Sequence, residues 1–149
     1  MFWRFHAGLR RCLAIGLFAV SLSLTPALAD GVLSGPVSHV RDGDTLEIVG
    51  VPIRLQGLHA PELGEDGGQA AKRFMQDLVA GETLRCELTG EQTYDRFVAT
   101  CFLAGTDVAA ALIRAGLGRD CPRFSGGRYA GLETDQAIER FPLPDYCRP

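Results

Sequence analysis

The sequence contains a single lysine, Lys72, and is poor in basic residues as a whole. It has 15 lysines and arginines against 18 aspartates and glutamates, and three of the arginines lie before Ala29, where no acidic residue occurs. The rest of the chain therefore carries 12 basic and 18 acidic residues, a net charge of −6. Proteins that coat nucleic acid are normally basic. Any contact with nucleic acid must therefore be local, through a few arginines.

The sequence also lacks the cysteine and histidine spacing of a zinc site. It contains no Cys-x-x-Cys, and only His39 and His59 follow residue 29, whereas structural zinc is usually held by four such ligands. Internal repeats and low-complexity tracts are absent as well. These absences, with about 120 residues after residue 29, predict one small domain with a single core.

The first 29 residues have the layout of a secretory signal. A basic start is followed by an apolar run over 12–24, Pro26 and the small-residue segment Ala27–Ala29. The apolar run is short for a membrane span, which needs ~20 residues. We expect cleavage after Ala29 and export to the periplasm or beyond, with no transmembrane anchor left. The alternatives are an uncleaved anchor and an ordinary core helix.

Hydrophobic alternation predicts a mainly β domain. Strands are expected over 36–41, 45–49, 51–58, 83–88 and 96–103. In the third of these, Ile53 and Leu55 share one face and Arg54 lies on the other. Helical spacing predicts helices over 67–80 and 106–116, with Thr106 as the N-cap of the second.

The order of these elements predicts an α+β fold. A helix after the third strand and another after the fifth suggest a five-stranded OB-fold barrel packed with two to three α-helices, over residues 30–140. Within it, 121–129 reads as an irregular loop and 128–140 as a short helix. Residues 141–149 form a Pro-rich, cysteine-anchored tail.

Four cysteines remain after the signal: Cys86, Cys101, Cys121 and Cys147. An even number in an exported chain favours disulfides, and four cysteines allow three pairings. A Cys86–Cys101 bridge fits two successive strands, and Cys121–Cys147 would then join the tail to the body. The alternative is that Cys86 and Cys101 are small buried residues with free thiols.

An acidic turn and two arginines carry the chemistry. Asp42-Gly43-Asp44-Thr45 precedes a strand, Arg54 and Glu62 follow, and Arg96 begins the last strand. Each alone fits a turn or a surface ion pair. Together they complement a phosphodiester: a carboxylate orients the attacking water, and guanidiniums stabilise the charge that develops on the phosphate. Carboxylates could also hold a cation that polarises the phosphate.

At these residues the sequence resembles the staphylococcal nuclease (thermonuclease) family. The similar segments are Val40–Thr45, Arg54–Glu62, Tyr94–Ala99 and Ala111–Leu117, in the family's order and spacing. The resemblance implies a calcium-dependent endonuclease on a five-stranded barrel, cutting single- and double-stranded DNA and RNA. A monomer is expected.

The resemblance also implies roles for individual residues. The two arginines that grip phosphate correspond to Arg54 and Arg96, and the base or water-orienting carboxylate corresponds to Glu62. Tyr94 corresponds to a substrate-binding tyrosine. These four residues are all present.

The implied metal site departs from the family's pattern. Asp44 matches a metal-binding aspartate and Ala60 a carbonyl ligand, but His59 stands where a second aspartate is expected. Calcium prefers hard oxygen ligands, so imidazole is a poor substitute. Manganese, zinc or nickel would then be preferred, unless His59 binds no metal at all.

Further departures leave two main hypotheses for function. Asp95 places a negative charge beside Arg96, and Phe124 stands where an aromatic hydroxyl is expected. The favoured hypothesis is an exported nuclease hydrolysing DNA or RNA with an altered metal site. The alternative is a non-catalytic OB-fold module that binds an anionic ligand or a partner protein. A weaker third is a structural envelope protein.

Overall fold

The computed structural model describes residues 31–149, so the predicted signal over 1–29 lies outside the described residues. The main strands are β1 (Val32–Val40), β2 (Thr45–Ile48), β3 (Val51–Leu55), β5 (Thr83–Thr93) and β6 (Arg96–Leu103). Three shorter strands are β4 (Leu58–His59), β7 (Thr106–Asp107) and β8 (Arg119–Asp120). The helices are α1 (Gly68–Val79), α2 (Val108–Arg114), α3 (Pro122–Ser125) and α4 (Asp135–Arg140), with 3-10 turns η1 (Ala130–Leu132) and η2 (Asp145–Cys147).

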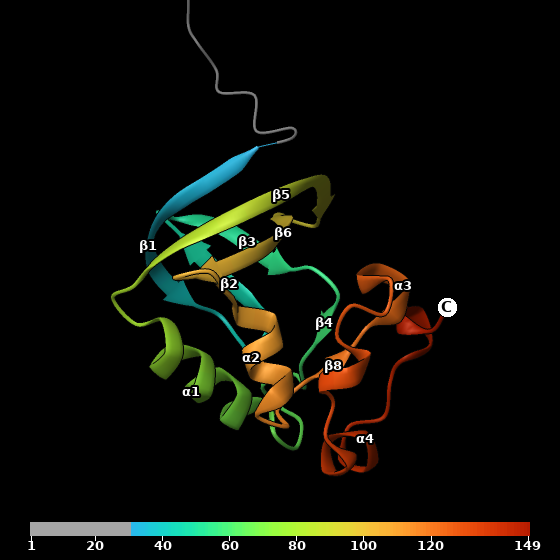
Figure 1. Cartoon of the computed structure of the whole chain (residues 1–149). Helices are drawn as coiled ribbons and strands as arrows, with labels where there is room; N and C mark the ends of the chain where they lie inside the picture. Colours follow the sequence, from blue (N-terminus) through green and yellow to red (C-terminus); the bar gives the residue numbers. More distant parts are fainter. Residues whose placement is uncertain (1–30) are drawn as a thin grey trace, which may run out of the picture.

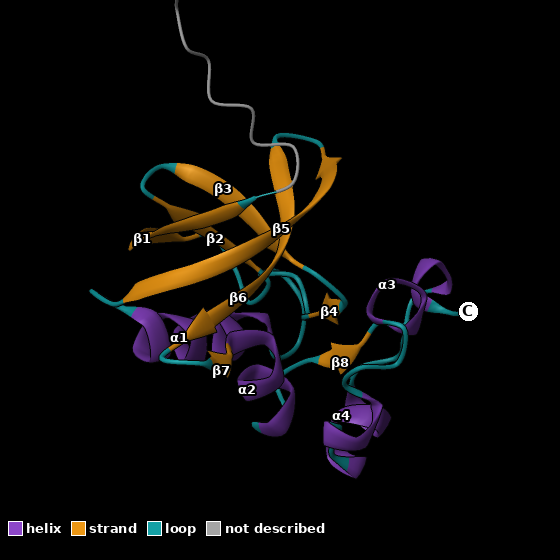
Figure 2. Ribbon diagram, turned by 45° about the horizontal axis from the view of Figure 1, so that its top comes forward, coloured by secondary structure: helices purple, strands orange, loops and turns teal. Residues whose placement is uncertain are grey.

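The five main strands form a ring-like sheet of the OB type. They pair antiparallel in the order β3-β2-β1-β5-β6, and a parallel pairing of β3 with β6 closes the ring (Figure 2). Helices α1 and α2 lie below the sheet in Figure 1. The α+β, mainly β fold predicted from the hydrophobic pattern is confirmed.

Strand β3 shows why the alternation was informative. Ile53 and Leu55 are buried in the core, whereas Arg54 between them is only partly covered. In α1, Ala71, Met75 and Val79 are fully buried at helical spacing. Burying such side chains stabilises the fold by about 1.5–3 kcal/mol for each large one. The core therefore fixes which face of β3 is left for Arg54.

Several local predictions were wrong in detail. The strand expected over 51–58 is divided into β3 and β4, and the helix expected over 128–140 is the turn η1 followed by α4. The N-cap of α2 is Asp107 and not Thr106, because one carboxylate oxygen of Asp107 accepts hydrogen bonds from the N–H groups of both Ala109 and Ala110, at 2.9 and 3.2 Å. The predicted irregular loop contains the short helix α3, which starts at Pro122, a favoured first helical residue.

The C-terminal segments pack on one side of the sheet, beside β4 and β8 (Figure 1). A disulfide joins Cys121 to Cys147, and Cys147 is fully buried. Phe141 is also buried, and its carbonyl oxygen accepts a 2.7 Å hydrogen bond from Arg119. The tail is thus held at both of its ends.

A second disulfide, Cys86–Cys101, links opposite positions of β5 and β6. Among residues 31–149, no helix has the length and apolar character needed to cross a membrane.

Candidate active site

Four of the residues predicted from the sequence line one groove. Arg54, Glu62, Tyr94 and Arg96 all border a hollow of about 630 Å³. One wall comes from the ends of β3, β5 and β6, and the other comes from the segment around α3 and from the C-terminal tail. The strand pairing of β3 with β6 is what brings the two arginines to the same opening.

The acidic turn 42–45 lies behind this groove. Asp42 caps the turn by accepting a 3.0 Å hydrogen bond from the N–H of Asp44. Gly43 is required because a Cβ there would stand 2.8 Å from the Cβ atoms of both Ala60 and Ala71. The turn therefore packs tightly against α1, and Asp44 is buried, with 3% of its surface exposed.

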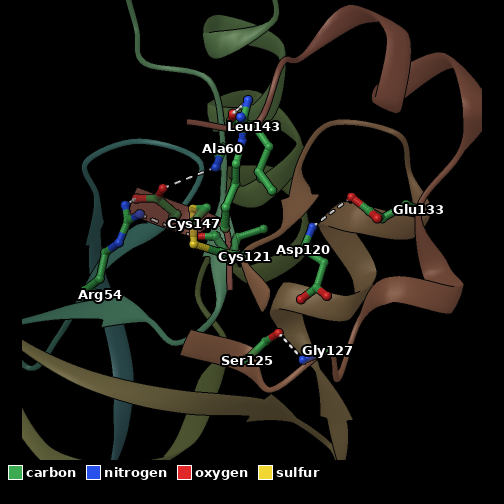
Figure 3. The surroundings of a disulfide bond; sticks show 12 residues. Arg54, Ala60, Asp120, Cys121, Ser125, Gly127, Glu133, Leu143 and Cys147 are labelled. Carbon is green, nitrogen blue, oxygen red and sulfur yellow. Dashed lines mark hydrogen bonds and ion pairs between the residues drawn. A yellow bond between two sulfur atoms is a disulfide. The ribbon is translucent and has the colours of Figure 1, made fainter. Parts of the chain in front are cut away.

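Arg54 is held from both sides. One guanidinium nitrogen forms an ion pair with Asp44, and another donates a 3.2 Å hydrogen bond to the carbonyl oxygen of Leu58. Figure 3 shows this arginine among the surroundings of the Cys121–Cys147 disulfide. Because its side chain is about one-fifth exposed, part of the guanidinium remains open to the groove.

Arg96 is positioned through Thr45. The Thr45 hydroxyl accepts a 3.0 Å hydrogen bond from Arg96 and donates one of 3.1 Å to Asp44. One turn thus holds both guanidiniums, since Asp44 pairs with Arg54 and Thr45 with Arg96. Two fixed guanidiniums at one opening are suited to an oxyanion with several oxygens, such as a phosphate.

Asp44 is the most perturbed carboxyl group near the groove. Burial raises the pKa of Asp44 to about 7, although the positive charge of Arg54 acts in the opposite direction. Its second carboxylate oxygen accepts a 3.3 Å hydrogen bond from the N–H of Ala60. Both oxygens of this carboxylate therefore already have protein partners.

Glu62 and Tyr94 are the exposed members of the groove. Glu62 follows the buried Pro61, its carboxylate is accessible to solvent, and its N–H donates a 3.0 Å hydrogen bond to Glu65. Tyr94 is 95% exposed at the β5–β6 turn and has a positive φ of 56°. The guanidinium carbon of Arg96 lies 5.7 Å from the centre of its ring.

Asp95 does not oppose Arg96 in the way its position in the sequence suggests. Its carboxylate pairs instead with Arg41, at 2.8 Å, and Arg41 also contacts Glu47 at 2.8 Å. The nearby Arg41 guanidinium lowers the pKa of Asp95. The negative charge of Asp95 is therefore partly offset by an arginine outside the groove.

Comparison with known proteins decides the family. The family model described as "Staphylococcal nuclease homologue" matches residues 52–134, which is more than half of the chain. The chain belongs to the staphylococcal nuclease family. The matched region contains Arg54, Glu62 and Arg96, and it begins after Asp44.

Three curated proteins are similar in sequence to this chain. The succinoglycan biosynthesis protein ExoI of Rhizobium meliloti is 38% identical over 108 residues, which is 64% of this chain and 56% of that protein. An uncharacterized endonuclease of Escherichia coli O157:H7 is 34% identical over 89 residues, 56% of this chain and 58% of that protein. An uncharacterized endonuclease of Haemophilus influenzae is 27% identical over 86 residues, which is 54% of this chain and 48% of that protein. The chain spans about half the length of these relatives.

The resemblance to this family implies a bound calcium ion, but the donor atoms present in this chain do not match the oxygen ligands that calcium requires. Calcium takes about six to eight oxygen ligands. Asp44 supplies one carboxylate, already bonded to Arg54, Thr45 and Ala60. Within residues 31–149, no cluster of three or more His, Cys, Asp or Glu side chains is arranged to hold a metal ion. The set Asp44, His59 and Ala60 stays a prediction as a metal site.

His59 packs against an aromatic ring of the tail. Its imidazole lies edge-to-face with Tyr146, with ring centres 6.3 Å apart and planes at 87°. Burial lowers the pKa of His59, and the charge of Arg54 lowers it further. A neutral imidazole is thus favoured, in contact with the C-terminal tail.

Sequence reasoning missed several residues at the groove. Thr45 was recognised only as part of a turn, although its hydroxyl connects the two halves of the site. Gln56, Arg123 and Tyr146 also line the groove. The only signal for Tyr146 was its position next to Cys147, and that signal requires the disulfide pairing to be known.

Proposed function

We propose that this chain is an exported nuclease that hydrolyses phosphodiester bonds of DNA or RNA, of the thermonuclease type. The observation that carries the proposal is the convergence of Arg54, Glu62 and Arg96 on one groove. Family membership and the relatives named as endonucleases support it. An acidic protein with a local pair of arginines fits a substrate bound through a few phosphates.

The two arginines take the phosphate. Arg54 and Arg96 donate hydrogen bonds to its non-bridging oxygens, and these strengthen as the phosphorus becomes pentacoordinate and gains negative charge. Their partners Asp44 and Thr45 hold the guanidiniums in place before the substrate arrives. Such preorganisation means that little reorientation is needed at the moment of reaction.

Glu62 acts on the attacking water. Its exposed carboxylate at the groove orients the water and accepts its proton as the new P–O bond forms. The P–O bond to the leaving oxygen breaks on the opposite side of the phosphorus, and this oxygen takes up a proton from solvent. Tyr94 offers an exposed ring for the nucleotide next to the scissile phosphate.

We also propose the domain organisation expected from the sequence: a cleaved signal over 1–29, a nuclease-like domain over 30–140 and an anchored tail over 141–149. The two disulfides indicate an oxidising compartment outside the cytoplasm. Mass spectrometry of the protein exported by an expressing cell tests the first boundary, with a new N-terminus at Asp30 expected. A protein that keeps Met1 contradicts it.

A non-catalytic binding module remains the second candidate. One observation favours it: both carboxylate oxygens of Asp44 already have protein partners, in Arg54, Thr45 and Ala60, which compete with a cation. Such a module would bind single-stranded DNA in the same groove without cutting it. The two candidates therefore differ in a directly measurable product.

The deciding experiment is a cleavage assay with purified protein and single-stranded DNA. Reactions contain calcium, manganese, zinc or a chelator, and Glu62→Ala and Arg54→Ala are run beside the unchanged protein. We expect cleavage that is lost in both variants. Cleavage that persists in both variants, or that occurs under no condition, overturns the proposal.

Matched controls separate the groove from general charge effects. Arg85→Ala removes an arginine that pairs with Glu87 outside the groove, and Glu139→Ala removes an exposed carboxylate of α4. Both should cleave like the unchanged protein. A loss in these controls equal to that in Glu62→Ala would show that net charge, and not the groove, governs activity.

A further inference from the structure

The C-terminal tail brings an aromatic ring to the groove. Tyr146 lies in η2, 84 residues after Glu62 along the chain, and yet both line the same hollow. Tyr146 is about half exposed, at 52%. The tail is fixed on each side of it, by the buried Phe141 upstream and by the fully buried Cys147 directly after it.

The surroundings of Tyr146 set how the ring is presented. His59 packs edge-on against it, and η2 is in contact with α3. Tyr146 shares the groove with Arg54 and Glu62, and partial burial there raises the pKa of its hydroxyl. The ring is thus an anchored, partly open surface close to where the phosphate would sit.

The neighbouring helix α3, which contacts η2, adds an aromatic and a basic side chain to the same wall. Phe124 is 47% exposed and lines the groove, with the guanidinium carbon of Arg123 6.0 Å from its ring centre. The α3 segment that carries them is fixed by Gly57. This glycine has a φ of 70°, and a Cβ on it would overlap Ser125. Gln56 adds a hydrogen bond of 3.4 Å to the carbonyl oxygen of Phe124.

We propose that Tyr146, carried on the disulfide-anchored tail, is a nucleobase-stacking residue of the groove, and that the groove takes single-stranded nucleic acid with an unpaired base against this ring. Aromatic rings beside a cationic groove are the usual platform for unpaired bases, because every base has a π-face. A base inside a duplex is stacked on its neighbours and cannot reach the ring. The inference rests on the proposed function, since it assigns a base next to the phosphate held by Arg54 and Arg96.

The test measures binding separately from cleavage. The probe is a fluorescently labelled oligothymidylate, bound to Glu62→Gln protein with chelator present, and affinity is read by anisotropy. A second probe has the same backbone with abasic sugars in place of the nucleotides. When the Tyr146→Ala substitution is introduced into the Glu62→Gln protein, binding of the intact probe should weaken by about 5- to 150-fold, the range found for loss of one base–aromatic stack.

Four comparisons make the result specific. Tyr146→Phe keeps the ring and should bind within about twofold of its parent, as expected for stacking without a required hydroxyl. Ile138→Ala removes a similarly exposed apolar side chain from α4 and should leave affinity unchanged. On the abasic probe, Tyr146→Ala should have no effect. A duplex of the same length should compete poorly.

The outcomes distinguish this inference from the proposed function. If Tyr146→Ala binds the intact probe as its parent does, or weakens both probes equally, the stacking role is wrong. No binding of the intact probe by the parent also overturns it. If stacking is observed while the unchanged protein cuts no nucleic acid, the inference stands and the nuclease proposal fails. If the unchanged protein cuts DNA and Tyr146→Ala leaves the affinity for the probe unchanged, the nuclease proposal stands and the stacking inference fails.

Discussion

The two walls of the groove are held in place by different means. The sheet wall carries Arg54 and Arg96 on paired strands, and each guanidinium has a partner in the acidic turn. The tail wall carries Phe124 and Tyr146 on short helical turns, with both residues about half exposed. The two arginines proposed to bind the phosphate thus lie on paired strands with side-chain partners, whereas the two aromatic residues lie on short turns held by local contacts.

The two disulfides repeat this contrast. Cys86–Cys101 joins strands that are already paired along their length. Cys121–Cys147 joins α3 to the tail, which share no strand pairing. The first bridge reinforces an existing geometry, whereas the second creates the geometry of the tail wall. The variants below test whether the walls differ in function as they do in construction.

The largest effect is expected at the sheet wall. Arg96→Lys keeps the charge but removes the planar pair of donors that fits a phosphate. We expect kcat on single-stranded DNA to fall by about 10²- to 10³-fold, as for the loss of one transition-state donor. Arg85→Lys, outside the groove, is the matched control and should be unaffected. Arg96→Lys activity within threefold of the unchanged protein would contradict this role.

Removal of each disulfide should separate the two walls. Cys121→Ser with Cys147→Ser, and Cys86→Ser with Cys101→Ser, should each lower the free energy of unfolding by about 3 kcal/mol, from the similar loop lengths. Only the double variant of Cys121 and Cys147 should bind oligothymidylate more weakly, with a loss of affinity no larger than the loss expected for Tyr146→Ala. Denaturant unfolding and anisotropy measure the two quantities. Equal losses of affinity in both double variants would remove the distinction.

Thr45 tests whether the acidic turn positions Arg96. Thr45→Val removes the hydroxyl that accepts from Arg96 and donates to Asp44. We expect kcat to fall by about tenfold, the equivalent of one hydrogen bond to a charged group. Affinity for the abasic probe should change less than kcat. Because Thr45→Ser restores the hydroxyl, it should restore kcat, and failure of that rescue would point to packing instead.

The smallest effect is expected at His59. His59→Asp adds a carboxylate at the position where the family's pattern has one, and hard oxygen ligands suit calcium. We expect calcium to stimulate cleavage by the variant about twofold or more beyond its effect on the unchanged protein. A calcium titration of initial rates is the measurement. An identical calcium response in both proteins means that His59 does not stand in a metal site.

The sheet wall was predicted well from the sequence because it is determined by patterns among neighbouring residues. Alternation in β3 placed Ile53 and Leu55 inward, and Arg54 is left partly exposed between them. The glycine-containing acidic turn was recognised from its residues alone. What the pattern could not supply was the hydroxyl of Thr45 as a bridge, because that contact spans 51 residues, between the turn and β6.

The tail wall was not predictable in the same way. Residues 121–129 were expected as an irregular loop, and the helix α3 forms there because Pro122 starts it and the Gly57 turn leaves room for Ser125. Tyr146 lies directly before Cys147, whose disulfide with Cys121 holds this part of the tail at the groove. Long-range covalent pairing cannot be deduced from spacing when four cysteines allow three pairings.

One paired measurement tests the division of labour between the walls most directly. Single-turnover cleavage and equilibrium binding of the same single-stranded oligonucleotide are compared for Glu62→Gln and Tyr146→Ala. We expect Glu62→Gln to slow cleavage by about 10²- to 10⁴-fold with affinity nearly unchanged, and Tyr146→Ala to weaken affinity with the cleavage rate of the bound complex nearly unchanged. If both variants alter the same quantity, or if Glu62→Gln cleaves at the unchanged rate, the two walls do not divide catalysis and base binding between them.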